Sequence, residues 1–507
     1  MGIKIIIVGG SIAGLSLANM LEKFDIDYTI LEAYSQIAPQ VGASIGLLPN
    51  GLRILDQLGC YERLREAAGN YYHRVVFRDA KGKPISSNPG PTISERMEKQ
   101  QSAGYASLWV DRQMLLQILY DNLKQKDKVL TNKRVVHVET SSTGVVVKTE
   151  DGSTYAGDIL VGGDGVHSKV RQEMWRIASV SDPTAFPPEE RSIVQSSMKC
   201  IFGISKQPAN FPPGATQQSS FFQGHLYLVI SAPGGRVYWF LFHELDGTKH
   251  GKDIPKFSKD DELLLATQYR DDHITEDMTF GDLYDNRIKS TLVPLEEHVF
   301  RRWHFQRILI IGDAATKVLR PTHNEHMYFV VETRADNVFQ VHPIAAQGGN
   351  GAIEAAANLV NAITRTEIPS SPDLRLEFIE KALGEVCAIR YERASSMMKK
   401  GRRDGSFLCQ QPPFSSLLIH YVLPWLGDDI FFKEVLKQSL AGPRIEKLPA
   451  PERPHTTPYN DELPRTSAES SLVHLDDRNA RSRHAWHGRA PRPEHWTVGM
   501  DGEKPLT

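Results

Sequence analysis

The chain has 507 residues, of which 40% are apolar and 24% are charged, a composition typical of a globular protein with two or three domains. Lys and Arg number 59 and Asp and Glu number 61, so the charge balance gives no reason to expect nucleic-acid binding, and small molecules are the expected partners. The four cysteines, Cys60, Cys200, Cys387 and Cys409, are too far apart for CxxC metal or redox pairs, and no metal site is predicted.

The N-terminus runs directly into a strand-like apolar segment and lacks the pattern of a signal peptide, which predicts a cytoplasmic protein. Residues 414–426 (FSSLLIHYVLPWL) are apolar, but they are shorter than the ~20 residues needed to span a bilayer. They also contain Pro424. We therefore predict a buried helix, with peripheral membrane contact through 414–432 as the alternative.

A nucleotide-binding βαβ unit is predicted at the start of the chain. Residues 3–8 (IKIIIV) indicate a buried strand, 12–24 a helix and 28–31 a second strand. The turn Gly9-Gly10-Ser11-Ile12-Ala13-Gly14 follows the first strand, and Glu32 ends the second. In a dinucleotide site such glycines let backbone amides approach a pyrophosphate, while the acid binds ribose hydroxyls. Ser11 replaces the usual middle glycine, and a purely steric turn is the alternative interpretation.

A β-rich region follows. Segments 134–140 and 145–149 indicate strands, with a further turn at Asp151-Gly152. From about residue 192 to 245 the chain is again rich in strand patterns, and Pro233-Gly234-Gly235 is predicted to connect two long strands. We expect an antiparallel sheet separate from the nucleotide fold.

Three later glycine-containing motifs are candidates for the same site. They are Gly162-Gly163-Asp164-Gly165 with 166–171 (VHSKVR), Gly312-Asp313-Ala314-Ala315 after the apolar run 308–311, and Gln347-Gly348-Gly349-Asn350-Gly351 before a helix at 352–364. Each motif alone could be a simple turn or a helix cap. The proline-rich, weakly periodic sequence after Lys447 predicts a disordered tail.

The order of these motifs resembles the group A FAD-dependent monooxygenases related to salicylate and p-hydroxybenzoate hydroxylases. The stretches VGGSIAGL, GASIGLLPNGLRILDQLG (42–59), FGIS (202–205), GDAA and AAQGGNGAIEAA are most similar to the fungal enzymes of meroterpenoid pathways. The resemblance covers roughly residues 3–465. It implies an FAD cofactor, NAD(P)H and O2 as co-substrates, and a hydrophobic small-molecule substrate that receives one oxygen atom while the other leaves as water.

The resemblance also implies roles for individual residues. It makes Gly9, Ser11 and Gly14 parts of the FAD-binding turn and Glu32 the ribose ligand. The other FAD contacts implied are Gly46, Arg112, Asp313, Gly348 and Gly349, and Asp164 belongs to a motif implicated in both FAD and NAD(P)H binding. Arg112 begins a predicted helix after Asp111, where a solvated arginine is the alternative. A helix opening at Gly349 would direct its positive end at the flavin.

Catalytic side chains are harder to assign. The family often has an arginine just before FGIS and a tyrosine about twenty residues later, where this chain has Lys199 and Phe221. Lys199, Tyr227 and Tyr238 are the polar candidates in the substrate sheet. The alternative for each, which the sequence favours, is a strand residue whose polar end lies in solvent.

An insertion separates two of the motifs. In the resembling proteins a proline and the glycines follow GDAA after a few residues, whereas here residues 318–340 intervene. Val318 begins the insertion and Val341 follows it, and valine codons begin with GT, as introns do. Gln340 can be encoded by CAG, the form of an intron end, and Ala335-Asp336 by GCTGAC, the form of a fungal branch-point sequence. Our hypothesis is a retained intron, which raises the alternative of a flavin-binding protein that the insertion has inactivated.

The predicted fold class is α/β, with a Rossmann-type FAD-binding domain, an antiparallel substrate sheet and C-terminal helices. The predicted boundaries are 1–75, 100–180 and 295–370 for the FAD domain, 76–99 and 181–294 for the substrate domain, 371–447 for the helical region and 448–507 for the tail. The expected reaction is epoxidation of a prenyl or terpenoid double bond, with aromatic ring hydroxylation as the alternative.

Overall fold

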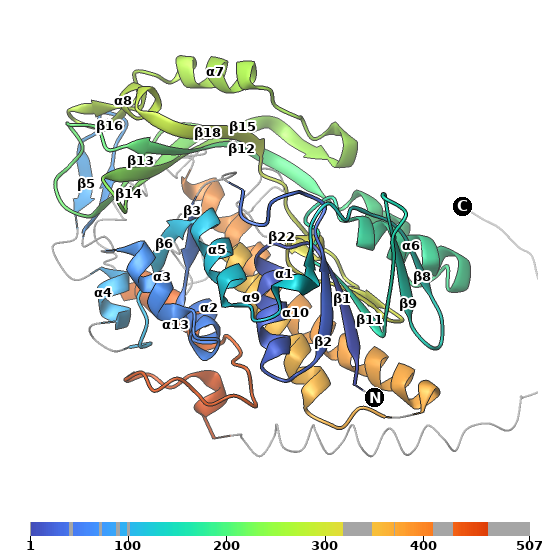
Figure 1. Cartoon of the computed structure of the whole chain (residues 1–507). Coiled ribbons are helices and arrows are strands. Elements are labelled where there is room, and N and C mark those ends of the chain that lie inside the picture. Colours follow the sequence, from blue (N-terminus) through green and yellow to red (C-terminus); the bar gives the residue numbers. More distant parts are fainter. Residues whose placement is uncertain are drawn as a thin grey trace, which may run out of the picture. The chain divides into compact units, whose positions relative to one another are not determined.

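The computed structural model describes residues 2–39, 44–69, 74–87, 92–98, 102–317, 347–369, 371–408 and 429–464. The insertion 318–340 and the apolar segment 414–426 lie outside the described residues. Contacts divide the chain into two units, Met1–Asp461 and Glu462–Thr507. All the sheets belong to the first unit (Figure 1).

A six-stranded sheet forms the centre of the nucleotide fold, in the order β20-β21-β11-β1-β2-β7. Its strands are β1 (Lys4–Val8), β2 (Asp27–Leu31), β7 (Val129–Leu130), β11 (Ile159–Gly162), β21 (Ile308–Ile310) and the antiparallel edge strand β20 (His304–Phe305). Strand β1 pairs in parallel with β11 and β2. Its run of isoleucines is buried because both faces of the six-stranded sheet are covered by other parts of the chain, among them strand β10 of a different sheet.

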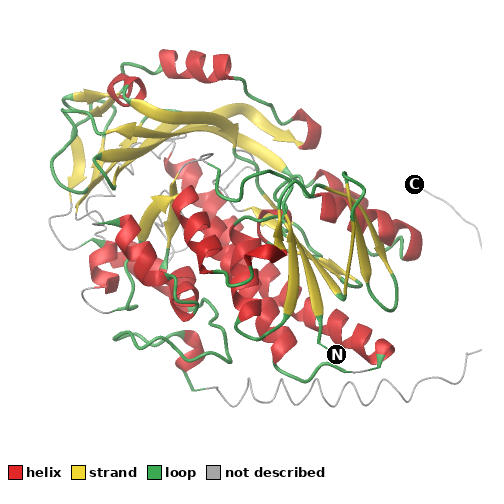
Figure 2. Cartoon of the chain, viewed as in Figure 1, coloured by secondary structure: helices red, strands yellow, loops and turns green. Residues whose placement is uncertain are grey.

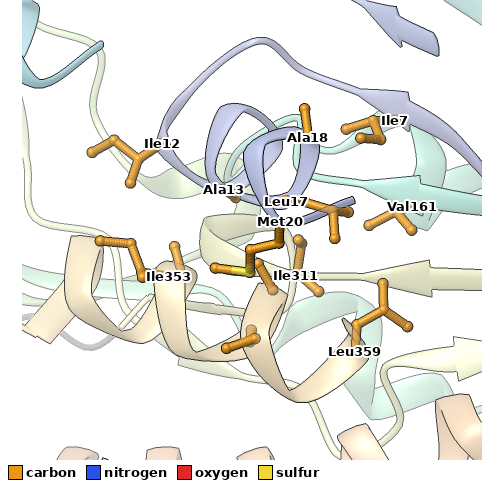
Figure 3. Close-up of a cluster of buried hydrophobic side chains, with 14 of the residues drawn as sticks. Ile7, Ile12, Ala13, Leu17, Ala18, Met20, Val161, Ile311, Ile353 and Leu359 are labelled. Atoms are coloured by element: carbon orange, nitrogen blue, oxygen red, sulfur yellow. The ribbon is translucent and has the colours of Figure 1, made fainter. Parts of the chain in front are cut away.

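Two helices cross beside the end of β1. Helix α1 (Ile12–Glu22) packs against α9 (Gln347–Thr364), and both are buried over most of their length. Figure 3 shows Leu17 and Met20 of α1 gathered with Ile353 of α9 and Ile311. Burying such side chains contributes about 1.5–3 kcal/mol each, so this packing fixes the position of both helix N-termini.

Further elements complete this part. The remaining helices are α2 (Pro49–Gln57), α3 (Tyr61–Ala68), α4 (Ile93–Glu98), α5 (Arg112–Asn122), α6 (Lys169–Ser181), the long α10 (Pro372–Leu408) and α13 (Asp429–Leu440). Strand β3 (Ser44–Leu47) pairs with β6 (Leu108–Asp111), and β8 (Val135–Thr140), β9 (Val145–Thr149) and β10 (Thr154–Gly157) form a three-stranded sheet.

A seven-stranded sheet forms the second layer, in the order β18-β12-β15-β14-β13-β4-β5 (Figure 2). Its strands are β4 (Arg74–Arg78), β5 (Pro84–Ser87), β12 (Gln195–Lys206), β13 (Thr216–Phe221), β14 (His225–Ala232), β15 (Arg236–His250) and β18 (Arg287–Pro294). All neighbours are antiparallel except β13 and β4. The predicted turn between β14 and β15 is confirmed, and Gly234 and Gly235 adopt φ values of 71° and 64° there.

The two faces of this sheet have different surroundings. The outer face packs under α7 (Lys259–Gln268) and α8 (Phe280–Asp285), with Val229 and Trp239 among its residues. The inner face carries Leu228 and Phe240 and packs against Trp109 of β6. The inner face is therefore the one that meets the FAD-binding part of the chain.

The expected strands and helices of the βαβ unit, the hairpins and the long sheet are confirmed. Helix α9 begins at Gln347, five residues before the predicted start. The predicted disorder of 448–507 is wrong for residues 448–461, which pack onto α2 and α3, while residues 465–507 lie outside the described residues. Tyr459 is 1% exposed and Arg53 binds Asp461 at 2.6 Å, so side-chain anchors order a segment whose composition predicted disorder.

Among the residues that the structure describes, no helix is long and apolar enough to cross a membrane.

Candidate functional site

The first glycine turn has a geometry that excludes larger residues. Gly9 adopts φ +105°, and a Cβ atom there would lie 2.5 Å from the carbonyl oxygen of Gly163. A Cβ atom on Gly14 would overlap the carbonyl oxygen of Gly9. The side chain of Ser11 makes no capping hydrogen bond to α1. The turn thus presents backbone amides at a helix N-terminus, which is the arrangement that binds a pyrophosphate.

The other motifs meet this turn at Ala13. A Cβ atom on Gly163 would lie 3.4 Å from Ala13 Cβ, and one on Gly312 would lie 3.3 Å from the same atom and 3.4 Å from Ala352 Cβ. Segments about 150 and 300 residues from the turn are therefore brought into contact with it. The motifs on both sides of the insertion, Gly312 before it and Ala352 after it, also touch each other.

Glu32 lies where β2 ends, and its carboxylate organises the turn. Oε2 accepts a hydrogen bond from the backbone N–H of Gly10 at 2.6 Å, and Oε1 accepts one from Tyr34 N–H at 2.9 Å. The side chain is nearly buried. A carboxylate has about four acceptor positions, so two of them are left to receive ribose hydroxyls.

Arg112 provides a cation at the start of α5. It lies at the first position of α5 and is half-buried, and among the described residues its guanidinium makes no hydrogen bond or ion pair. Burial lowers its pKa, and the nearby charges of Asp313 and Glu32 act in the opposite direction. A desolvated guanidinium of this kind fits a diphosphate, so the position of Arg112 suits the FAD contact that the resemblance implies for it.

Gly46 and Gly349 lie on the two sides of a close contact. A Cβ atom on Gly349 would collide with Ile45, next to Gly46 on β3. Asn350 holds this contact by donating to the carbonyl oxygen of Gly46 at 3.1 Å and accepting from Leu48 N–H at 3.1 Å. Gly348 has open space around its Cβ position. The sequence did not single out Asn350, although it stands within the glycine motif.

The carboxylate of Asp164 forms hydrogen bonds within the protein. Its carboxylate accepts from the hydroxyl of Ser168 at 2.5 Å and from the backbone N–H groups of Lys169 and Val170 at 2.7 and 3.1 Å. These bonds cap the start of α6. A direct role in FAD or NAD(P)H binding stays a prediction for this residue.

Arg171, the last residue of the second motif, and His298, which the sequence did not identify, join the second and third motifs. Arg171 donates to the carbonyl oxygens of Val166 at 2.6 Å and Ala314 at 2.7 Å. His298 is buried and donates from Nε2 to the carbonyl oxygen of Asp313 at 3.0 Å, and burial and the charge of Arg171 lower its pKa to about 3. A neutral His298 therefore supports the backbone of Asp313, whose own side chain is half-buried.

The structure does not bring the three catalytic candidates together. Lys199 and Tyr227 lie on the outer face of the seven-stranded sheet. The Lys199 ammonium is 5.7 Å from the centre of the Phe257 ring, and burial lowers the Lys199 pKa. The hydroxyl of Tyr227 donates to Asp272 at 2.7 Å.

Tyr238 lies on the inner face, and its hydroxyl donates to Asp111. Burial, together with Asp111, raises the Tyr238 pKa. Arg236 binds the same carboxylate at 2.8 Å. Asp111 immediately precedes Arg112 in the chain. The contacts of Asp111 with Tyr238 and Arg236 therefore connect the substrate sheet to the residue that we expect to bind the diphosphate.

Aromatic side chains cover the inner face beside this group. Trp109 of β6 lies 6.1 Å from Phe240 between ring centres, and Phe240 lies 5.5 Å from Phe202 on the neighbouring strand, both edge-to-face. Trp109 and Phe202 are partly exposed. We call Trp109, Phe202 and Phe240 the aromatic row. Within the described ranges, no group of three or more His, Cys, Asp and Glu side chains is placed to hold a metal.

Proteins similar in sequence to this chain are FAD-dependent. A family model described as an FAD binding domain matches residues 2–194. The chain is 34% identical to the FAD-dependent monooxygenase ausM of Penicillium brasilianum over 452 residues, which cover 89% of this chain and 88% of the relative. It is 38% identical to the FAD-dependent monooxygenase spyC of Aspergillus fumigatus, with 84% of each chain covered.

Solved structures share the fold. HpxO of Klebsiella pneumoniae, in a complex with FAD and uric acid, matches with a TM-score of 0.66 at 21% identity, over 87% of this chain and 97% of that one. The 2,6-dihydroxypyridine-3-hydroxylase of Arthrobacter nicotinovorans matches with a TM-score of 0.57 at 17% identity, over 82% and 94%. The expected α/β fold with an FAD-binding domain is thereby confirmed.

Proposed function

Because the chain belongs to the FAD-dependent monooxygenases of fungi, we propose that it takes electrons from NAD(P)H and epoxidises a double bond of a prenyl or terpenoid substrate. The proposed setting is a meroterpenoid pathway, as the sequence resemblance implied.

The aromatic row is the observation that carries this proposal. It lies on the inner face of the substrate sheet, and Trp109 is three residues from Arg112, so an apolar surface begins beside the FAD-binding element. Aromatic faces bind apolar chains by burying area. An alkene also needs no loss of a proton before it is oxidised, so a surface of this kind suits it without an acid or base of the protein.

The protein's own contribution is to bind, orient and exclude water. Bound FAD supplies the redox chemistry, accepting a hydride from NAD(P)H and activating O2. The amides after Gly9 and the guanidinium of Arg112 would hold the pyrophosphate, and Glu32 would accept hydrogen bonds from the ribose hydroxyls. Asp313 would contact the ribityl–pyrophosphate region of the cofactor. The inner face of the sheet holds the substrate and keeps water from the reacting atoms.

Ring hydroxylation is the second candidate, and one observation favours it. The hydroxyl of Tyr238 donates to Asp111 on the inner face, and such a pair could receive the proton of a phenol substrate. Hydroxylation of phenols depends on this proton transfer, whereas epoxidation does not.

Product analysis separates these functions. The purified FAD-bound protein would be given NADPH or NADH, isotope-labelled O2 and polyprenylated aromatic compounds. We expect one labelled oxygen on the prenyl chain, as an epoxide, and a Tyr238→Phe variant that still forms it. A labelled hydroxyl on the ring that Tyr238→Phe abolishes would favour the alternative. NAD(P)H oxidation without any oxygenated product would count against both.

A further inference from the structure

A cluster of charged side chains is buried between the first two turns of α9 and helix α10. Glu354, in the second turn of this helix, is completely buried, and Arg390 and Arg393 of α10 reach it with side chains 2% and 15% exposed. Arg393 donates to the two carboxylate oxygens at 2.9 and 2.8 Å, and Arg390 also donates to the carboxylate. Asn50 of α2 completes the set at 2.6 Å. We call Glu354, Arg390 and Arg393 the charge cluster.

The charge cluster has a net charge of +1. Guanidinium groups stay protonated in proteins. Burial acts to raise the pKa of Glu354, but the two arginines hold it below its ordinary value, so the carboxylate is ionised. One carboxylate thus faces two guanidinium groups. The excess positive charge lies among helices α9, α10, α2 and α13, where the carbonyl oxygen of Gln438 also accepts a hydrogen bond from Arg393.

This charge lies near the end of α9 that faces the expected cofactor. Nη2 of Arg390 donates to the carbonyl oxygen of Gly351 at 3.3 Å. A Cβ atom on residue 351 would lie 3.2 Å from that nitrogen, so glycine leaves room for the approach. Gly351 is two residues after Gly349, or about 3 Å along the helix axis at 1.5 Å per residue.

Stability alone gives little reason for such a group. Buried ion pairs cost desolvation energy, and replacing them with apolar side chains is often neutral or stabilising. Charge enclosed in a protein interior is screened much less than charge at the surface. The charge of the cluster has the same sign as the N-terminal end of the helix dipole, so the two would act in the same direction on a group bound at that end.

We propose that the charge cluster raises the reduction potential of the FAD bound at the start of α9, because its net positive charge stabilises the negatively charged reduced flavin. Glu354, Arg390 and Arg393 therefore do not touch the flavin, and they act on it through the electric field of their net charge at the start of α9. The proposal rests on FAD binding and on the predicted place of Gly349, and it does not depend on which substrate is oxidised.

Opposite charge changes in one cluster provide the test. Glu354→Gln raises the net charge to +2 and Arg393→Gln lowers it to zero, while both substitutions keep side chains that can hydrogen-bond. The FAD-bound proteins would be titrated with dithionite against a reference dye, with flavin absorbance as the readout. We expect a higher midpoint potential than wild type for Glu354→Gln, a lower one for Arg393→Gln, and a value near wild type for Arg393→Lys.

The matched control is Arg365→Gln, just after the other end of the same helix, where Arg365 pairs with Glu385 and Glu446 in an exposed position. It should leave the potential unchanged. Shifts of the same sign in Glu354→Gln and Arg393→Gln, or none in either, would overturn the proposal. If Glu354→Gln fails to retain FAD, equal potentials in Arg393→Gln and Arg393→Lys would overturn it as well.

Discussion

Replacing Glu32 by alanine tests two contributions of one carboxylate. In the structure it accepts hydrogen bonds from the amides of Gly10 and Tyr34, and it is also the predicted ligand of the ribose hydroxyls. Hydrogen bonds to a charged acceptor contribute about 1.5–3 kcal/mol. Loss of those to the ribose should weaken FAD binding by roughly 10- to 150-fold, and loss of those to the amides should destabilise the protein even without cofactor.

Two measurements separate these contributions. Quenching of flavin fluorescence during titration of the apoprotein gives the FAD affinity, and thermal unfolding of the apoprotein gives the stability. Glu150→Ala is a suitable control, because Glu150 is exposed and 3.7 Å from Arg134, and it should change stability by less than ~0.5 kcal/mol. A destabilised Glu32→Ala apoprotein with wild-type FAD affinity would show that the carboxylate serves the turn and not the ribose.

Three further outcomes are expected. Asp313→Ala should weaken FAD binding or slow flavin reduction in stopped-flow experiments, and unchanged values for both would remove Asp313 from the site. Deleting 318–340 should raise FAD occupancy and the product formed per NAD(P)H consumed, because a short connection fixes the motifs on either side, and ~1 Å of misplacement can cost about a hundredfold in rate. Equal values in both proteins would show the insertion to be a genuine loop that the site tolerates. Tyr238→Phe should lower stability by about 1–3 kcal/mol in thermal unfolding, because it leaves Asp111 with one fewer buried donor, and a wild-type transition would contradict this.

Local sequence patterns predicted much of the fold. The turn after Gly9, the acid at Glu32 and the hairpin turn at 233–235 each depend on residues close together in the chain, so composition and spacing are enough to indicate them. Asn350 and the charge cluster could not be predicted in this way. Their partners lie far away in sequence, and residue spacing gives no sign of which helices meet.

The side chains on each face of the substrate sheet could be predicted from the sequence only in part. The turn at 233–235 sets the register, so that Ile230 pairs with Tyr238 and Tyr227 with Leu241. Tyr227 and Ile230 are three residues apart, and side chains alternate along a strand, so Tyr227 and Tyr238 must lie on opposite faces. The sequence contained this information, but the hairpin register was needed to use it.

Residues 442–461, near the end of the chain, pack against helix α2 near its beginning. Arg453 binds Asp56 at 2.5 Å, and Asp461 binds the buried Arg53 at 2.6 Å. During synthesis α2 leaves the ribosome roughly 400 residues before these partners exist, and contacts so distant in sequence form slowly. A nascent chain therefore completes the ion pairs of α2 only after Arg453 and Asp461 have been synthesised, so the packing around this helix is finished at the end of translation.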